Sequence, residues 1–439
     1  MLRAAASVFL ACALAAPATA AGLPEPVTDA AYAPVNPAEA ALGQLLFYDP
    51  ILSGNREVSC ATCHHPRLGT SDGLSLSLGD GGIGLGPDRV ADPQNPPEAR
   101  VPRNAPALFN LGAHEFTRLF HDGRIEVDAT RATGFRTPLE DDMVSGFASL
   151  LSAQTMFPVL SADEMAGHLQ ENEVSRAVRQ GLLTGPGGAW DLIARRVAAV
   201  PGYAAQFART YPRIQTPEDI GFTDISNAIA AFMALEWRSD QAPFDAWLRG
   251  TGTLSEQALA GSALFYGRAE CHTCHSGPFQ TDHGFHAMGA PQIGPGKAAK
   301  FEQHSRDEGR FRVTGRAEDL FAFRTPSLRN VAQTAPYGHA GGHADLAGFI
   351  ADHAAPAQAL AGYDISQAVL PELPVKDAQI MSDPDEVAAI AAAATWSVNL
   401  SEADIAALVA FLDSLTDPAA ATGRLGVPST VPSGLQVAR

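Results

Sequence analysis

The chain has 439 residues, of which 48 are acidic and 30 are basic, so its formal net charge is −18. This balance argues against a nucleic-acid-binding protein, because such proteins present a basic surface. It is compatible with attraction of a basic partner protein, although any acidic exported protein would have the same balance. A chain of this length suits two domains, each able to bury its own core.

The first residues have the pattern of a secretory signal peptide. Arg3 precedes an apolar run over residues 4–16, and Ala18-Thr19-Ala20 is a small-x-small cleavage site. We expect residues 1–21 to be removed on export, together with Cys12, and the mature protein to be soluble and periplasmic. A lipid anchor at Cys12 is the alternative, but the apolar run before it is short. No later apolar stretch is long enough for a membrane span.

Four of the five cysteines lie in two copies of the pattern Cys-x-x-Cys-His. The copies are Cys60-Ala61-Thr62-Cys63-His64 and Cys271-His272-Thr273-Cys274-His275. The pattern is typical of covalent haem c attachment, in which both thiols bond to the haem and the histidine becomes the proximal iron ligand. Zinc would require further ligands at zinc spacing, and a redox dithiol does not require the histidine. We expect two haem c groups, each with one axial position still to be assigned.

The sequence around the two motifs is duplicated. Residues 42–48 precede the first motif and are echoed by 260–266 before the second, and residues 103–108 are echoed by 324–329. We therefore expect a mainly α protein with long loops, built from two cytochrome c-like domains that each carry one covalent haem c. The expected limits are a signal peptide over 1–21, a first haem domain over 22–245, a second haem domain over 246–416 and a C-terminal tail over 417–439.

Capping signals and apolar spacing predict individual helices. Asn36-Pro37 predicts the start of a helix that ends at Tyr48. Ser161-Ala162-Asp163-Glu164 has the pattern of a capping box and predicts the start of another helix. Further helices are predicted over 225–237, over 255–266 and from Ser401 onwards. Residues 240–252 are expected to link the two domains.

Beyond the haem motifs, the chain resembles the bacterial di-haem cytochrome c peroxidases and their MauG-type relatives over nearly its whole mature length. The stretches that carry the resemblance are 42–53, 103–106, 120–124, 164–165, 323–331 and 334–337. The resemblance implies that the haem on His64 keeps an open side for hydrogen peroxide and that the haem on His275 stores or relays electrons. It also implies a homodimer and a small cytochrome c or cupredoxin as electron donor.

The resemblance assigns roles to several polar residues. Glu164 would move a proton from the near to the leaving oxygen of peroxide, although the capping box alone would also explain this residue. His121 stands where many members have a tryptophan between the haems, and it either bridges them by hydrogen bonds or is a polar residue in a turn. Asn104, with the carbonyls of Thr334 and Pro336, matches a calcium site, unless Asn104 only stabilises its turn.

Two positions depart from the classical pattern. Asp80 stands where classical members have a loop histidine that caps the peroxidatic iron, so we expect this haem to be open in the fully ferric protein. His353 stands where other members have methionine or tyrosine, and we expect it to ligate the second iron. His343 and Met381 are the alternatives. A second imidazole would give a lower potential than methionine.

The expected function is therefore reduction of hydrogen peroxide to water in the periplasm. One alternative is MauG-type, peroxide-dependent oxidation of a protein or another bulky substrate, which the open pocket and the non-methionine ligand favour. The other alternative is a non-catalytic di-haem electron-transfer cytochrome. The stretches 132–157 and 363–396 are longer than a compact peroxidase needs, and they either shape a partner surface or are decoration.

Overall fold

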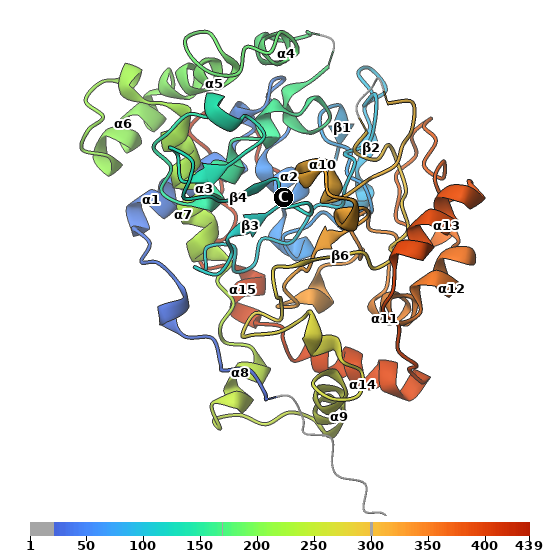
Figure 1. Ribbon diagram of the computed structural model, residues 1–439. Coiled ribbons are helices and arrows are strands. Elements are labelled where there is room, and N and C mark those ends of the chain that lie inside the picture. Colours follow the sequence, from blue (N-terminus) through green and yellow to red (C-terminus); the bar gives the residue numbers. More distant parts are fainter. Residues whose placement is uncertain (1–21, 169, 299–301) are drawn as a thin grey trace, which may run out of the picture.

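The computed structural model describes residues 22–168, 170–298 and 302–439, so the expected signal peptide lies outside the described residues. Helices dominate, strands are short and long loops connect them (Figure 1), which confirms the predicted mainly α class. The helices are α1 (Pro37–Tyr48), α2 (Cys60–Cys63), α3 (Leu150–Thr155), α4 (Glu173–Arg179), α5 (Ala189–Ala198), α6 (Pro201–Thr210), α7 (Phe222–Glu236), α8 (Pro243–Leu248), α9 (Glu256–Phe265), α10 (Phe311–Thr314), α11 (Leu346–Ala354), α12 (Pro356–Ala361), α13 (Pro384–Ala393), α14 (Glu402–Asp413) and α15 (Pro418–Thr422).

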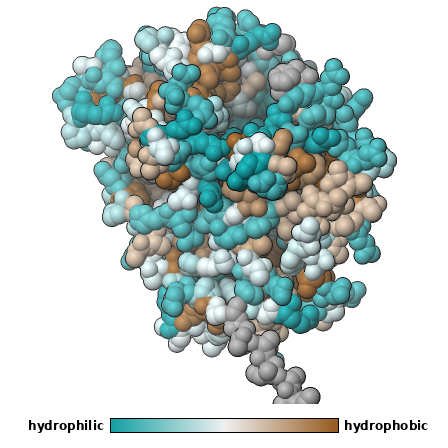
Figure 2. All heavy atoms as spheres, in the orientation of Figure 1, coloured by the Kyte–Doolittle hydropathy of each residue, from teal (hydrophilic) through white to brown (hydrophobic). Residues whose placement is uncertain are grey.

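The strands form three small antiparallel sheets. They are β1 (Gly82–Ile83) with β2 (Val90–Ala91), β3 (Arg118–Leu119) with β4 (Ile125–Val127) and β5 (Phe135–Arg136), and β6 (Phe285–His286) with β7 (Phe323–Arg324). No helix within the described ranges combines the length and the apolar character needed to cross a membrane. Hydrophilic residues cover much of the face shown in Figure 2, with smaller apolar areas between them.

One helix crossing occurs twice in the chain. Helix α1 packs on α7, and α9 packs on α14 at one end of the molecule (Figure 1). At each crossing a glycine meets a backbone carbonyl. A Cβ added at Gly43 would lie 1.8 Å from Ala228 O, and one added at Gly261 would lie 1.9 Å from Ala407 O. Only a residue without a Cβ allows the helices to approach so closely.

A second element is repeated with the same hydrogen bonds. Asn110 and Asn330 both have positive φ angles, of 62° and 60°. The backbone N–H of Asn110 donates to Trp237 O at 3.0 Å, and that of Asn330 donates to Leu415 O at 3.2 Å. Each asparagine side chain then accepts the backbone N–H two residues beyond that carbonyl, at 2.7 Å. The two halves of the chain therefore share one local architecture, as the duplicated sequence predicts.

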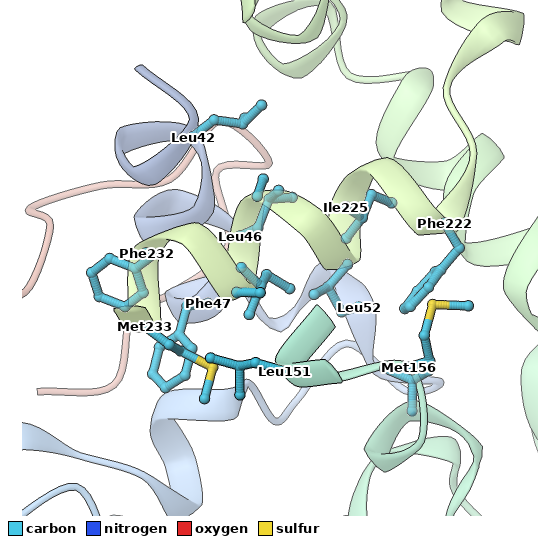
Figure 3. Close-up of a cluster of buried hydrophobic side chains, with 14 of the residues drawn as sticks. Leu42, Leu46, Phe47, Leu52, Leu151, Met156, Phe222, Ile225, Phe232 and Met233 are labelled. Atoms are coloured by element: carbon cyan, nitrogen blue, oxygen red, sulfur yellow. The ribbon is translucent and has the colours of Figure 1, made fainter. Parts of the chain in front are cut away.

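The two helix pairs lie in separate hydrophobic cores. The larger core gathers side chains from α1, α3, α5, α6 and α7, and Figure 3 shows Leu46 and Phe47 of α1 beside Ile225 and Phe232 of α7. The smaller core surrounds Phe411 and takes side chains from α8, α9 and α14. Each core therefore includes the helix that precedes one Cys-x-x-Cys-His motif.

The predicted helix starts at Asn36 and Ser401 and two further predicted helices are confirmed. The side chain of Asn36 accepts Ala38 N at 2.9 Å at the start of α1, and that of Ser401 accepts Asp404 N at 3.2 Å at the start of α14. The helices expected over 225–237 and 255–266 are α7 and α9.

The prediction of a helix that starts at Ser161 is wrong beyond the first turn. Residues Ala162–Ala166 form a single π-helical turn. The carbonyl of Glu164 accepts Asp80 N at 3.0 Å, and that of Met165 accepts Gly54 N at 2.7 Å. These carbonyls are therefore not available to continue an α-helix.

The expected linker over 240–252 is also wrong as a description of this segment, because it contains α8. Phe244 is fully buried in the smaller core. Asp245 pairs with Arg329 at 2.5 Å, and both side chains are fully buried. A buried ion pair of this kind is costly to break, so the segment is part of the folded second half.

Glycine at the helix crossings gives a test of the duplicated packing. We expect Gly43→Ala or Gly261→Ala to destabilise the haem-loaded protein by about 1–3 kcal/mol or more, because the added methyl group overlaps a backbone carbonyl. Thermal or denaturant unfolding measures this loss. Gly362→Ala is the matched control, since a Cβ there would meet nothing within 4 Å. Equal stability of the crossing variants and the control would contradict the close approach.

Candidate functional site

Each Cys-x-x-Cys-His motif ends in a histidine that faces a backbone carbonyl. His64 Nδ1 lies 2.9 Å from Thr70 O, and His275 Nδ1 lies 3.1 Å from Gln280 O. Thr70 and Gln280 both have positive φ angles, of 62° and 49°. Burial lowers the pKa of both histidines, which favours neutral imidazole. A bond from Nδ1–H to the carbonyl fixes the tautomer and leaves Nε2 free to ligate a metal.

The cysteines of both motifs suit covalent attachment. Cys60, Cys63, Cys271 and Cys274 are all unpaired and partly buried. Cys60 and Cys63 are the two ends of α2, and Cys271 opens a single 3-10 turn. Two free thiols beside a histidine whose Nε2 is free form the donor set that haem c requires.

A cavity of about 300 Å³ lies over the second motif. Cys271, Cys274 and His275 line it together with His353 of α11. Burial, with smaller contributions from His275 and His343, lowers the pKa of His353 to about 4. The ring is therefore neutral near pH 7 and able to ligate iron. A cavity lined by two thiols and two imidazoles fits a haem with two histidine ligands.

The alternative ligands lie outside this cavity. His343 Nε2 is 2.7 Å from Asp352 Oδ2, and Met381 packs in two smaller apolar clusters. Neither residue lines the cavity. The structure thus places His353, of the three candidates, with His275.

The three residues expected to hold calcium also line the cavity. They are Asn104, Thr334 and Pro336. The Asn104 side-chain nitrogen donates to Leu74 O at 2.8 Å, which leaves its Oδ1 as the atom that a cation would use. All three residues line the same cavity, and the calcium ion stays a prediction.

His121 lies at the cavity beside a second histidine, His339. Burial and the charge of Arg103 lower the pKa of His121 well below its ordinary value. His339 stacks on Phe323, with ring centroids 3.8 Å apart and planes 13° apart. Neither ring nitrogen of His339 has a hydrogen-bond partner among the described residues, and burial lowers its pKa to about 4. Both histidines are therefore neutral near pH 7.

A buried ion-pair network lies next to these histidines. Arg103 Nη1 donates to Asp122 at 2.7 Å, and its Nε and Nη2 donate to Asp307 at 2.7 and 2.8 Å. Although burial opposes the shift, Arg103 lowers the pKa of Asp307 to about 2. The guanidinium joins the first half of the chain to the second.

Glu164 lies at the first motif. Its charge contributes to the raised pKa of the Cys63 thiol, for which burial is the main cause. Burial raises the pKa of Glu164 itself, and the positive charges of Lys297 and Arg124 oppose that rise. No local pattern in the sequence connects Lys297, a residue of the second half, with this site. Because burial and the two positive charges shift its pKa in opposite directions, the carboxyl of Glu164 can both accept and return a proton.

The loop that carries Asp80 is held by one guanidinium. Arg89 donates from Nε to Leu78 O at 2.5 Å, from Nη1 to Gly84 O at 2.7 Å and from Nη2 to Gly79 O at 2.7 Å. Three charge-assisted bonds from one planar group fix the shape of the loop.

The side chain of Asp80 is fully buried and engaged within the first half. Its Oδ2 accepts Asn55 Nδ2 at 2.7 Å, and the same nitrogen donates to Glu171 at 2.7 Å. Burial, with Glu171 and Glu57, raises the pKa of Asp80 to about 7. Asp80 therefore binds the loop to the segment that carries Glu164 and Glu171.

The sequence of the chain matches the di-haem cytochrome c peroxidase family over residues 37–253. The methylamine utilization protein MauG of Methylorubrum extorquens is 32% identical over 319 residues, covering 72% of this chain and 69% of that protein. Cytochrome c551 peroxidase of Pseudomonas aeruginosa is 28% identical over 320 residues, covering 73% and 72%. The chain therefore belongs to the di-haem cytochrome c peroxidase family, and it is an oxidoreductase.

Solved structures agree with this assignment. A MauG-like protein associated with microbial copper homeostasis aligns with a TM-score of 0.57 and 25% identity, over 93% of this chain and 97% of that one. The diheme peroxidase BthA from Burkholderia thailandensis aligns with a TM-score of 0.56 and 20% identity, over 92% and 91%, and shows the shared fold.

The raised pKa of Asp80 gives a prediction for stability. Between about pH 4 and about pH 7 the folded protein holds a proton that the unfolded chain has lost, so Asp80 lowers the free energy of unfolding as pH rises. We expect Asp80→Asn to remove this dependence, and the variant should gain stability relative to the wild type as the pH approaches 7. Thermal unfolding across this range measures the difference, with the exposed Asp88→Asn as control. Parallel curves for Asp80→Asn and wild type would show that Asp80 is ionised when buried.

Proposed function

We propose that the chain is a periplasmic di-haem c peroxidase that reduces hydrogen peroxide to water with electrons from a small cytochrome c or cupredoxin. Each half is inferred to be a cytochrome c-like domain with one covalent haem. The observation that carries the proposal is the difference between two otherwise equivalent motifs. The second has a further histidine, His353, in its cavity, whereas the first has the carboxyl of Glu164.

Glu164 is proposed to move the protons of the first site. Haem c on His64, when bound, supplies the redox-active iron. Glu164 takes a proton from the near oxygen of hydrogen peroxide and delivers it to the far oxygen, which leaves as water. The charges of Lys297 and Arg124 favour the ionised form that accepts the proton. Burial raises its pKa and so favours holding that proton until transfer.

We infer that the first site has no reductive gate, and the loop around Asp80 supports this inference. The bonds from Arg89 to three carbonyls hold this loop in place, and Asp80 itself is engaged with Asn55. Asp80 is also a poor ligand for haem iron. These contacts support a first haem site that is ready for peroxide in the fully ferric protein.

The second site is proposed to relay electrons to the first. His275 and His353 would ligate its iron from opposite sides, while His121 and His339 lie at the same cavity. Calcium at Asn104, Thr334 and Pro336 would tie the two halves together. The homodimer is a prediction from the family.

MauG-type oxidation of a protein or another bulky substrate is the second candidate. The engaged Asp80 and the non-methionine ligand favour it, and MauG is among the relatives. The fully ferric, haem-loaded protein is mixed with one equivalent of hydrogen peroxide in a stopped-flow spectrometer to distinguish these candidate functions. A fast change in the haem spectrum supports an open site. No reaction before reduction would indicate a gated peroxidase, and no reaction in any state would indicate an electron carrier.

Glu164→Gln tests the proton-transfer role. The amide keeps the size of the side chain and cannot shuttle a proton, so we expect the reaction with peroxide to slow by about 10²–10⁴-fold. Stopped-flow spectra of the ferric protein measure this rate. Asp163→Asn is the control, because it removes a neighbouring carboxyl and should leave the rate close to wild type. An unchanged rate in Glu164→Gln would reject the assignment.

His353→Met tests the second axial ligand. Because methionine ligation raises haem potentials, we expect the potential of one haem to rise and the other to stay unchanged. Potentiometric titration followed by absorbance measures both. His343→Met is the control, since His343 lies outside the cavity. If His343→Met rather than His353→Met moved the potential, the assignment would be reversed.

A further inference from the structure

One aromatic side chain of the cavity over the second motif has no role in the proposed mechanism. Trp396 lines the cavity, and its ring centroid lies 5.8 Å from that of His353, with the planes at 46°. Phe349 stacks on His353 at 5.4 Å and 28°. The proposed axial ligand is thus packed against two aromatic rings.

Trp396 also reaches the protein surface. It is partly exposed, and it belongs to an extended segment in which exposed and partly buried residues alternate. The exposed residues are Thr395, Ser397 and Asn399. Trp396 and Leu400 line the cavity, and the backbone N–H of the intervening Val398 donates to Ala354 O at 2.9 Å, which fixes the segment against the end of α11.

The other tryptophans do not combine these two properties. Trp190 and Trp237 are buried in the larger core, and Trp247 stacks on Phe244 in the smaller core. None of the three lines the cavity. Of the four tryptophans in the chain, Trp396 alone contacts the proposed ligand and reaches the surface.

We propose that Trp396 is the relay residue through which electrons pass between a docked redox protein and the second haem site. The proposal rests on the proposed function, in which His353 is an axial ligand. Electron transfer slows steeply with distance, and the indole provides an aromatic path from the surface to the ring of His353. Indole can also lose and regain one electron, which phenylalanine cannot do under these conditions.

The electrons balance over one turnover. Reduction of one hydrogen peroxide to two waters takes two electrons and two protons. Trp396 gives up one electron toward His353 and regains one from the partner, and this happens twice, so Trp396 is unchanged and two partner molecules are each oxidised by one electron. Without a partner, the indole itself can supply both electrons. One water molecule then adds its oxygen atom to the indole, and the indole and the water together release two protons along with the two electrons.

The partner expected at this surface is a small, basic, single-haem cytochrome c. The residues beside Trp396 are polar and uncharged, so they can pack closely against a partner at low desolvation cost. The net charge of −18 attracts a basic protein over longer distances.

The test compares haem-loaded Trp396→Phe, Trp396→Tyr and the control Trp247→Phe. Each ferric protein is mixed with one equivalent of hydrogen peroxide, and the change in its haem spectrum is timed. A reduced basic cytochrome c is then added, and its oxidation is timed separately. In a parallel sample without donor, a tryptophan radical is sought by electron paramagnetic resonance, and peptide masses are searched for oxygen added at Trp396.

We expect Trp396→Phe to react with peroxide at the wild-type rate but to oxidise the cytochrome about tenfold more slowly or worse. Trp396→Tyr should recover much of the rate, because tyrosine is also redox-active, and Trp247→Phe should match wild type. The radical signal and the added oxygen should be absent from Trp396→Phe. An unchanged oxidation rate in Trp396→Phe would overturn the relay, as would equal slowing in the Phe and Tyr variants. Failure of the first step in wild type would instead reject the proposed peroxidase.

Discussion

A buried guanidinium joins the two halves of the chain at their boundary. Arg103 binds Asp122 of its own half and Asp307 of the other, and all three side chains are nearly inaccessible to solvent. Removing one partner of such a group leaves an uncompensated buried charge, which costs about 3–5 kcal/mol. The network lies beside His121, at the boundary between the His64 site and the His275 cavity. Arg310, which pairs with Glu126, and Arg100, which pairs with Asp377, add further ion pairs between the halves. Together these contacts give the fixed separation that the proposed electron transfer between the two sites requires.

The two halves share one local architecture but form two different sites. The two halves use the same types of contact. A glycine, Gly43 or Gly261, meets a backbone carbonyl at each helix crossing, and each motif histidine, His64 or His275, faces a backbone carbonyl. The difference arises on the opposite side of each expected haem, where long loops and α11 supply other residues. The features that the halves share are thus those that would hold a haem, and the features that differ are those to which the proposed proton transfer and electron relay are assigned.

Local features of the sequence predicted local features of the structure. The haem motifs, the caps at Asn36 and Ser401 and the repeated helices depend on neighbouring residues, and the structure contains them. The turn after Ser161 was not predictable, because Gly54 and Asp80 supply its decisive bonds from far along the chain. The same holds for α8, which is fixed by Arg329, and for the nearness of Lys297 to Glu164. The sequence does contain one signal for the proposed relay residue, because Trp396 is a single tryptophan flanked by the polar residues Thr395 and Ser397.

The last residues of the chain complete the core of the first half. Val431 and Val437 are buried there, and Ser433 Oγ donates to Asp49 at 2.7 Å across 384 positions of sequence. These residues follow the second half in the sequence, so the chain passes through the second half before it returns to the first. The first half taken alone therefore lacks part of its own core, and the two halves are not independent folding units in the way that their duplicated sequence suggests.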